Sequence, residues 1–164
     1  FKALVLVNAG FTLSVLRNSG FRAAELTETA FTGDELLSAG FTIVELKSAS
    51  YKLSDMRFSN FQAADFRDAG YTLDEMKEAG FGIVELKDEF SLHALKQAGF
   101  SAKKLRTANF SLEELKSAMF SVQELVEARF TASELQQGGF PSFELRGFFI
   151  PDELHEAGYS LSEL

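Results

Sequence analysis

The sequence predicts an all-α solenoid of about 17 ten-residue repeats, with one short capped helix in each repeat. Three observations carry this prediction. An aromatic residue returns about every ten positions, and an apolar residue, most often leucine, follows each aromatic after five positions. A serine or threonine comes directly after most of the aromatics, and an acidic residue lies three positions further on. Self-similarity at a fixed period is the sequence signature of repeat architectures.

The aromatics define position 1 of each repeat, and the unit reads aromatic-[ST]-x-x-[ED]-L-[KR]-x-A-G. Two repeats, those that start at Phe81 and Phe140, are one residue short. The aromatics are Phe1, Phe11, Phe21, Phe31, Phe41, Tyr51, Phe61, Tyr71, Phe81, Phe90, Phe100, Phe110, Phe120, Phe130, Phe140, Phe149 and Tyr159.

Positions 2 and 5 predict where each helix starts. A hydroxyl followed three residues later by glutamate is a capping box, in which each side chain accepts a hydrogen bond from the other residue's backbone N–H. Thr42 with Glu45 and Ser111 with Glu114 show this spacing, and position 5 is acidic in 13 of the 17 repeats. An acid in the first turn also interacts favourably with the helix dipole.

Positions 7 and 10 predict where each helix ends. A late lysine or arginine and a closing glycine are helix C-terminal signals. Pro151 falls at a first helical position, where proline is tolerated. We expect helices of about seven or eight residues, roughly 11 Å long, which are too short to be stable without their neighbours.

Packing between repeats must therefore hold the array together. Positions 3, 6 and 9 form an apolar stripe, and the aromatic at position 1, Phe110 for example, is placed to fix the chain's entry into the helix. Repetition of one unit predicts aromatic and leucine columns inside a solenoid. We expect one continuous solenoid over residues 1–164, a segment of a longer array, in which the nine-residue repeats are local irregularities rather than domain boundaries.

A right-handed quadrilateral β-helix is the alternative fold. The stretch "AADFRDAGYT", with Ala64-Asp65-Phe66 at its centre, resembles the pentapeptide-repeat proteins, whose acidic members are similar to DNA in shape and charge. Bulky Val44 and Val84 stand where that family has a small inward residue. The hydroxyl-to-glutamate spacing has a role in a helix cap and none in a β-helix, so the helical prediction is favoured.

The ten-residue unit also resembles the decapeptide repeats of the A-G-F-S-x-x-E-L-K-x type, found in arrays in proteins of bacteria and protists. The stretches "AGYTLDEMKEAGF" and "FSLEELKSA" carry the resemblance, which covers essentially the whole chain. The acid is missing at Val5, Val15, Ala94 and Lys104. The resemblance implies a structural or interaction segment and transfers no catalytic residue.

Composition narrows the class of partner. The chain of 164 residues has no cysteine, so a disulfide or thiolate zinc site is excluded. Its net charge of -8 disfavours a nucleic-acid partner, because phosphate contacts need an excess of lysine and arginine. No apolar run is long enough to cross a bilayer, so we expect no membrane insertion.

Residues able to carry chemistry are few, and each has a structural explanation. His93 and His155 occupy non-equivalent repeat positions and are interpreted as surface residues. The acids at position 5 could line up to hold Ca²⁺, but capping accounts for all of them. We therefore predict no catalytic, cofactor-binding or metal-binding residue, no cofactor and no enzyme activity. Asn109 starts an Asn-Phe-Ser glycosylation sequon, whose use the sequence leaves open.

The predicted function is a non-catalytic structural or scaffolding repeat protein that mediates protein–protein contacts or assembly into a larger structure. Its expected partners are other proteins or copies of itself, not a small molecule. The alternatives are a groove that binds a peptide or another ligand and, if the fold were a β-helix, an acidic DNA-mimicking inhibitor. Positions 4, 7 and 8 are expected to vary on the outer surface, where Lys103, Lys104 and Arg106 form a basic patch.

Overall fold

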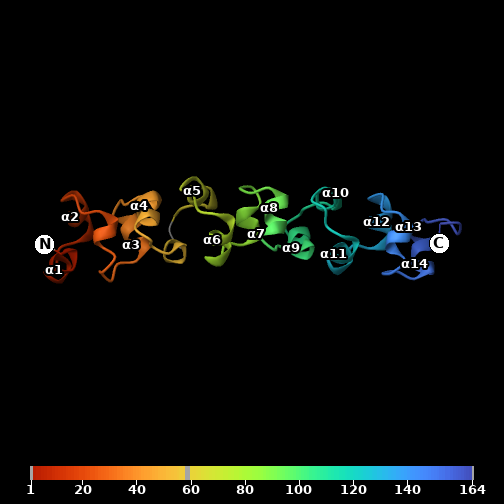
Figure 1. Ribbon diagram of the computed structural model, residues 1–164, viewed down its shortest axis with the longest axis horizontal. Helices are drawn as coiled ribbons and strands as arrows, with labels where there is room; N and C mark the ends of the chain where they lie inside the picture. Colours follow the sequence, from red (N-terminus) through yellow and green to blue (C-terminus); the bar gives the residue numbers. More distant parts are fainter. Residues whose placement is uncertain (1, 58–59, 164) are drawn as a thin grey trace. The chain divides into compact units, whose positions relative to one another are not determined.

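The computed structural model describes residues 2–57 and 60–163, and in that part of the chain it contains short helices and turns but no β-strand (Figure 1). The helices begin about every ten residues, so the predicted all-α repeat solenoid is confirmed. The β-helix alternative is wrong, because the cap spacing directs each repeat into a helix. The α-helices are α1 (Ala3–Asn8), α2 (Leu13–Asn18), α3 (Gly33–Ser38), α4 (Ile43–Ser48), α5 (Ala63–Asp68), α6 (Leu73–Glu78), α7 (Ile83–Leu86), α8 (Leu92–Gln97), α9 (Ala102–Thr107), α10 (Leu112–Ser117), α11 (Val122–Glu127), α12 (Ala132–Gln137), α13 (Ser142–Leu145) and α14 (Pro151–Glu156). Two 3₁₀-helices are η1 (Ala23–Glu25) and η2 (Leu53–Met56).

The chain divides into two compact units, Phe1–Glu89 and Phe90–Leu164. Their boundary falls at the end of the first nine-residue repeat, where the sequence had indicated a local irregularity and no boundary. Continuity of the two units in a single solenoid stays a prediction. Within each unit, helices two repeats apart are neighbours, as α4 and η1 are in the first and α12 and α14 are in the second.

The predicted capping box, with both hydrogen bonds, begins α3, α4, α6, α10, α11 and α12. At α4 the backbone N–H of Thr42 donates to Oε2 of Glu45 over 2.7 Å, and the N–H of Glu45 donates back to Oγ1 of Thr42 over 3.2 Å. Where position 2 has no hydroxyl, the acid at position 5 still accepts a hydrogen bond from the backbone N–H of position 2. The N–H of Gly82 donates to Glu85, and that of Ile150 donates to Glu153.

Each full-length helix has six residues, from position 3 to position 8, so the expected seven or eight was too long. At α3 the chain leaves the helix at Ala39, and Gly40 takes a left-handed φ of 95°. The N–H of Gly40 then donates to Leu37 and that of Phe41 to Leu36, the paired bonds of a Schellman turn. Position 9 is therefore a cap and position 10 a left-handed residue, which shortens the helix.

The nine-residue repeats are locally irregular, as predicted. Their helices, α7 and α13, have four residues instead of six. Deleting one residue from the unit removes the left-handed turn position. The carbonyls of Leu86 and Leu145 accept from residues three or four further along, Glu89 and Phe149, instead of from the residue five further along as in the full-length repeats.

The core is a column of position 6 side chains, and the predicted leucine column is confirmed. Among the described repeats after the first, these side chains are almost completely buried, as at Leu46, Phe66 and Leu125. The aromatic column is less uniform, because Phe61 is 39% exposed while Phe41 is 2% exposed. Phe110, which the sequence placed in the inner column, is only half-buried.

Removing one cap hydroxyl should weaken α4 measurably. Thr42→Ala leaves the N–H of Glu45 without its acceptor, so we expect the free energy of unfolding to fall by about 1 kcal/mol. Thr42→Ser keeps an acceptor and is the matched control. Urea denaturation of both variants measures the difference, and equal loss in the two would show that the hydroxyl does not act as a cap.

Candidate functional site

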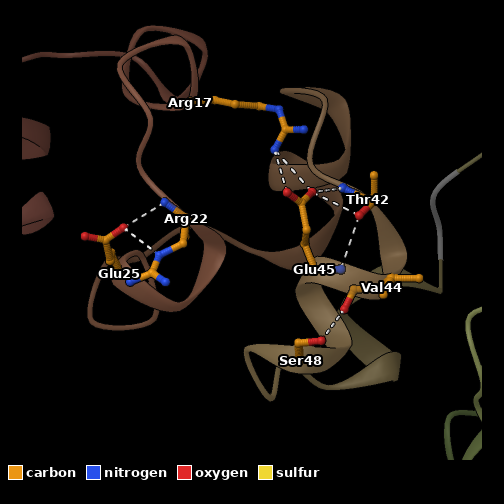
Figure 2. A network of polar contacts seen from close by, with 7 residues as sticks. All are labelled: Arg17, Arg22, Glu25, Thr42, Val44, Glu45 and Ser48. Atoms are coloured by element: carbon orange, nitrogen blue, oxygen red, sulfur yellow. Dashed lines mark hydrogen bonds and ion pairs between the residues drawn. The ribbon is translucent and has the colours of Figure 1, made fainter.

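The cation at position 7 contacts the repeat that lies three further along the chain. Arg17, near the end of α2, places its guanidinium 4.4 Å from the centre of the Phe41 ring. The same guanidinium lies 3.2 Å from the Glu45 carboxylate, which also accepts from the Thr42 N–H (Figure 2). We call this arrangement of position 7 cation, position 1 ring and position 5 acid a cation staple.

The staple recurs in both units. Arg106, in α9, lies 4.0 Å from the centre of the Phe130 ring, 2.8 Å from the carboxylate of Glu134 and 3.1 Å from the carbonyl oxygen of Ala128. Cation–ring pairs of this register include Arg17–Phe41, Lys47–Tyr71, Arg57–Phe81, Lys96–Phe120, Arg106–Phe130 and Lys116–Phe140. In five of these pairs the acid four residues after the ring completes the staple.

Three of the stapled glutamates, Glu45, Glu75 and Glu124, have a pKa below the ordinary value because each carboxylate has two partners. For Glu45, Glu75 and Glu124 the main cause is the backbone N–H of the cap residue, and the cation adds to it. Both partners favour the ionised carboxylate. These acids thus join the start of their own helix to the end of a helix three repeats earlier.

This lowered pKa predicts destabilisation by acid. The unfolded chain binds protons at these carboxylates more readily than the folded chain, so their contribution is present above the ordinary pKa, near 4.5. It is lost as the pH falls through the lower folded value. We expect urea denaturation to give a lower midpoint at pH 3 than at pH 7. Glu124→Gln should reduce that difference, whereas Glu127→Gln, at the other end of α11, should leave it unchanged.

In most of the described repeats, ring exposure follows the residue at position 7 three repeats earlier, but Phe90 and Phe110 are half-buried although Arg67 and Lys87 stand at that position. The rings of the six pairs named above are between 2% and 7% exposed. Where that position holds Val7, Thr27, Leu37 or Val126, the corresponding rings are half-buried or exposed; these are Phe31, Tyr51, Phe61 and Phe149. Tyr159 is buried without a cation, because its hydroxyl donates to the carbonyl of Phe140.

Two open grooves of the same register lie at rings without a cation. The Leu37 groove, about 500 Å³, is lined in the first unit by Leu37, Gly40, Phe41, Thr42, Ile43, Val44, Phe61, Asp65, Asp68 and Ala69. The Val126 groove, about 460 Å³, is lined in the second unit by Val126, Phe130, Thr131, Ala132, Ser133, Phe149, Glu153, Glu156 and Ala157. Each groove therefore combines an apolar residue at position 7, an aromatic ring that no cation covers and two acids.

A third groove of this register, in the first unit, holds two tyrosines. Tyr51 and Tyr71 both line it, and neither hydroxyl has a hydrogen-bond partner in the structure. Burial raises the pKa of Tyr51. Burial, together with the negative charge of Glu75, raises the pKa of Tyr71 to about 12. Both hydroxyls therefore stay protonated and can donate hydrogen bonds at neutral pH.

The structure does not bring the sequence-predicted polar residues into a catalytic or metal-ligand cluster. Within residues 2–57 and 60–163, no three histidines or acids are close enough to hold a metal ion. His93 lies beside Gln97, and Nδ1 of His155 lies 3.2 Å from the carbonyl oxygen of Tyr159. Absence of a cofactor, metal or catalytic residue stays a prediction.

Three surface expectations can be compared with the structure. Position 7 varies between repeats as expected, but where it holds a stapled cation the side chain covers a ring instead of projecting outward. The basic patch is therefore reduced to Lys103 and Lys104, since Arg106 belongs to a staple. Asn109 is exposed in a left-handed turn, and its glycosylation stays open. No described helix is long and apolar enough to span a membrane.

The helices, caps and staples define the class: an all-α repeat protein whose units differ mainly in how their rings are covered. The model of the family described as "Decapeptide repeat region" matches residues 31–93 and 89–161. The chain belongs to this decapeptide-repeat family, as the resemblance had indicated. Comparison with curated proteins and with solved structures gives no match.

Proposed function

We propose that the protein is a non-catalytic scaffold whose repeats bind other proteins and hold them in a larger assembly. The recurring groove is the observation that carries this proposal. Five grooves of one register are formed by the first residues of one repeat and the acids two repeats later. A surface that repeats along a solenoid is suited to extended binding.

The staples support a scaffolding role because they make the array self-supporting. Helices such as α4 and α11 are fixed at their start by a cap, and the cap's acid also binds a cation from a repeat three earlier in the chain. Positions 4 and 8 then remain on the surface, where exposed apolar side chains such as Val44 and Val84 can differ between repeats without loss of the core. Exposed apolar residues near polar ones are typical of interaction surfaces.

Purification from the source organism under native conditions tests this proposal. A tagged full-length protein should sediment with defined partners in a constant ratio, and the complex should re-form from the separately purified components. Isolation of the tagged protein alone, at every salt concentration used, would contradict a scaffolding role. Sedimentation of the purified protein across a concentration series separates foreign partners from copies of itself.

A ligand-binding groove is the second candidate, favoured by the groove that Tyr51, Tyr71 and Glu75 line in the first unit. A DNA-mimicking role was tied to the β-helix and has no support in the helical fold.

A further inference from the structure

We propose that the Leu37 groove and the Val126 groove each accept an arginine or lysine side chain from a basic partner protein. This inference rests on the proposed function and names the chemistry that the scaffold recognises. The partner's cation would occupy the place that the chain's own position 7 cation occupies in the six cation–ring pairs.

The stapled pairs show what such a place requires. A guanidinium in this register lies about as close to the ring centre as Arg106 does to Phe130, at 4.0 Å. One oxygen of Glu134 accepts from the cap N–H, and the other accepts from Arg106. The array therefore has a fixed set of groups for a cation: a ring face and one carboxylate oxygen.

The same groups are present in the Val126 groove, where the cation is replaced by valine. Phe149 is half-buried, and Glu153 uses Oε2 to accept from the Ile150 N–H. In the Arg106 staple the equivalent oxygen, Oε1 of Glu134, accepts from the guanidinium. Exposed Glu156 adds a second negative charge to the groove.

The Leu37 groove repeats the arrangement with a shorter acid. Phe61 is 39% exposed, and Asp65 accepts from the Gln62 N–H through Oδ2. Its second acid, Asp68, is paired with Arg67 at 2.7 Å, which reduces the charge available to a ligand. We therefore expect weaker cation binding in the Leu37 groove than in the Val126 groove.

Charge argues for a basic foreign protein rather than a second copy. The chain has a net charge of -8, so two copies repel each other. Many of its own position 7 cations already cover rings in staples. A cation over an aromatic face is worth about 0.5–1 kcal/mol at an exposed site, so affinity for a whole partner must come from several side chains.

The first test places a cation of the chain itself in each groove. Val126→Arg and Leu37→Arg restore the repeat consensus, and the new cation should cover Phe149 or Phe61. We expect each variant to raise the midpoint of thermal unfolding by about 2–4 °C. Val126→Met and Leu37→Met, which add no charge, are the matched controls and should not raise it. An equal rise in the methionine variants would contradict a cation place.

The second test uses a defined probe, N-acetylarginine methylamide, with the neutral citrulline analogue as its control at equal ionic strength. Nuclear magnetic resonance should show saturable shifts of the Phe149 and Phe61 ring protons, with a dissociation constant of roughly 1–10 mM. The shift at each ring should vanish in the variant that fills its groove. Arg106→Val, which copies the Val126 arrangement, should open a new site at Phe130.

The remaining outcomes overturn the inference. Equal shifts with citrulline, or shifts unchanged in the arginine variants, would show that no cation place exists. Self-association abolished by Val126→Arg would assign the groove to a second copy instead of a basic partner. If the native complex forms equally well with the doubly filled protein, the scaffold function stands and the cation proposal fails. If the probe binds but no native complex is found, the cation place exists and the scaffold function fails.

Discussion

Replacing Phe66 with alanine is expected to lower the free energy of unfolding by about 3–5 kcal/mol, because it leaves a cavity in the core of the first unit. Phe66 is completely buried at a position that most repeats fill with leucine. Its ring meets those of Phe61, Tyr71 and Phe81 edge to face, with centres 5.5–6.4 Å apart. Removal of the ring therefore forfeits three aromatic contacts together with the apolar burial.

Two control variants locate the effect. Phe66→Leu restores the repeat consensus and should cost less than about 1.5 kcal/mol, since leucine keeps most of the apolar volume of the side chain at this position. Phe61→Ala removes a ring that is already partly exposed, so its cost should also be smaller. Urea denaturation followed by circular dichroism measures all three. A cost for Phe66→Ala no larger than that for Phe61→Ala would contradict the assigned core.

Loss of one staple cation should have the second-largest effect. Arg106→Met keeps an apolar stem over Phe130 but removes the charge that interacts with that ring and with Glu134. The ion pair is partly exposed and so contributes modestly, and the cation–ring contact adds a similar amount. We expect the free energy of unfolding to fall by about 1–2 kcal/mol.

The control for this variant lies on the same helix. Lys103→Met removes the same charge from an exposed position of α9, so it should change stability by less than about 0.5 kcal/mol. Arg106→Lys should recover part of the loss, because Lys96 and Lys116 occupy the equivalent place over other rings. Stability equal in Arg106→Met and Lys103→Met would show that the staple is a contact without energetic weight.

The sequence predicted those features that depend on neighbours within one repeat. The capping box of Thr42 and Glu45, the left-handed turn at Gly40 and the buried leucine column all follow from local spacing. Helix length was overestimated because position 9 is compatible with helix in composition, whereas the turn at position 10 already uses it as a cap.

The staples and grooves could not be predicted from one repeat, because they depend on how many repeats the chain traverses before it returns to the same side. Arg17 was interpreted as a helix-end cation when its main contacts are in a later repeat. The sequence does carry a trace of this pairing. Cations at position 7 precede an acid by 28 residues in Arg17–Glu45, Arg57–Glu85 and Arg106–Glu134. The spacing of the cation and the acid alone does not reveal that the cation also covers an aromatic ring.

Because each ring is covered from three repeats away, the number of repeats between two points controls which surfaces are open. One extra decapeptide inserted between the repeats of Lys47 and Phe61 would place Lys47, instead of Leu37, in register with the Phe61 ring. The groove would close although none of its own residues had changed. Duplication or loss of a single repeat in the gene can thus change which rings are covered on both sides of the inserted or lost repeat. The number of repeats then determines which grooves are open as well as the length of the array.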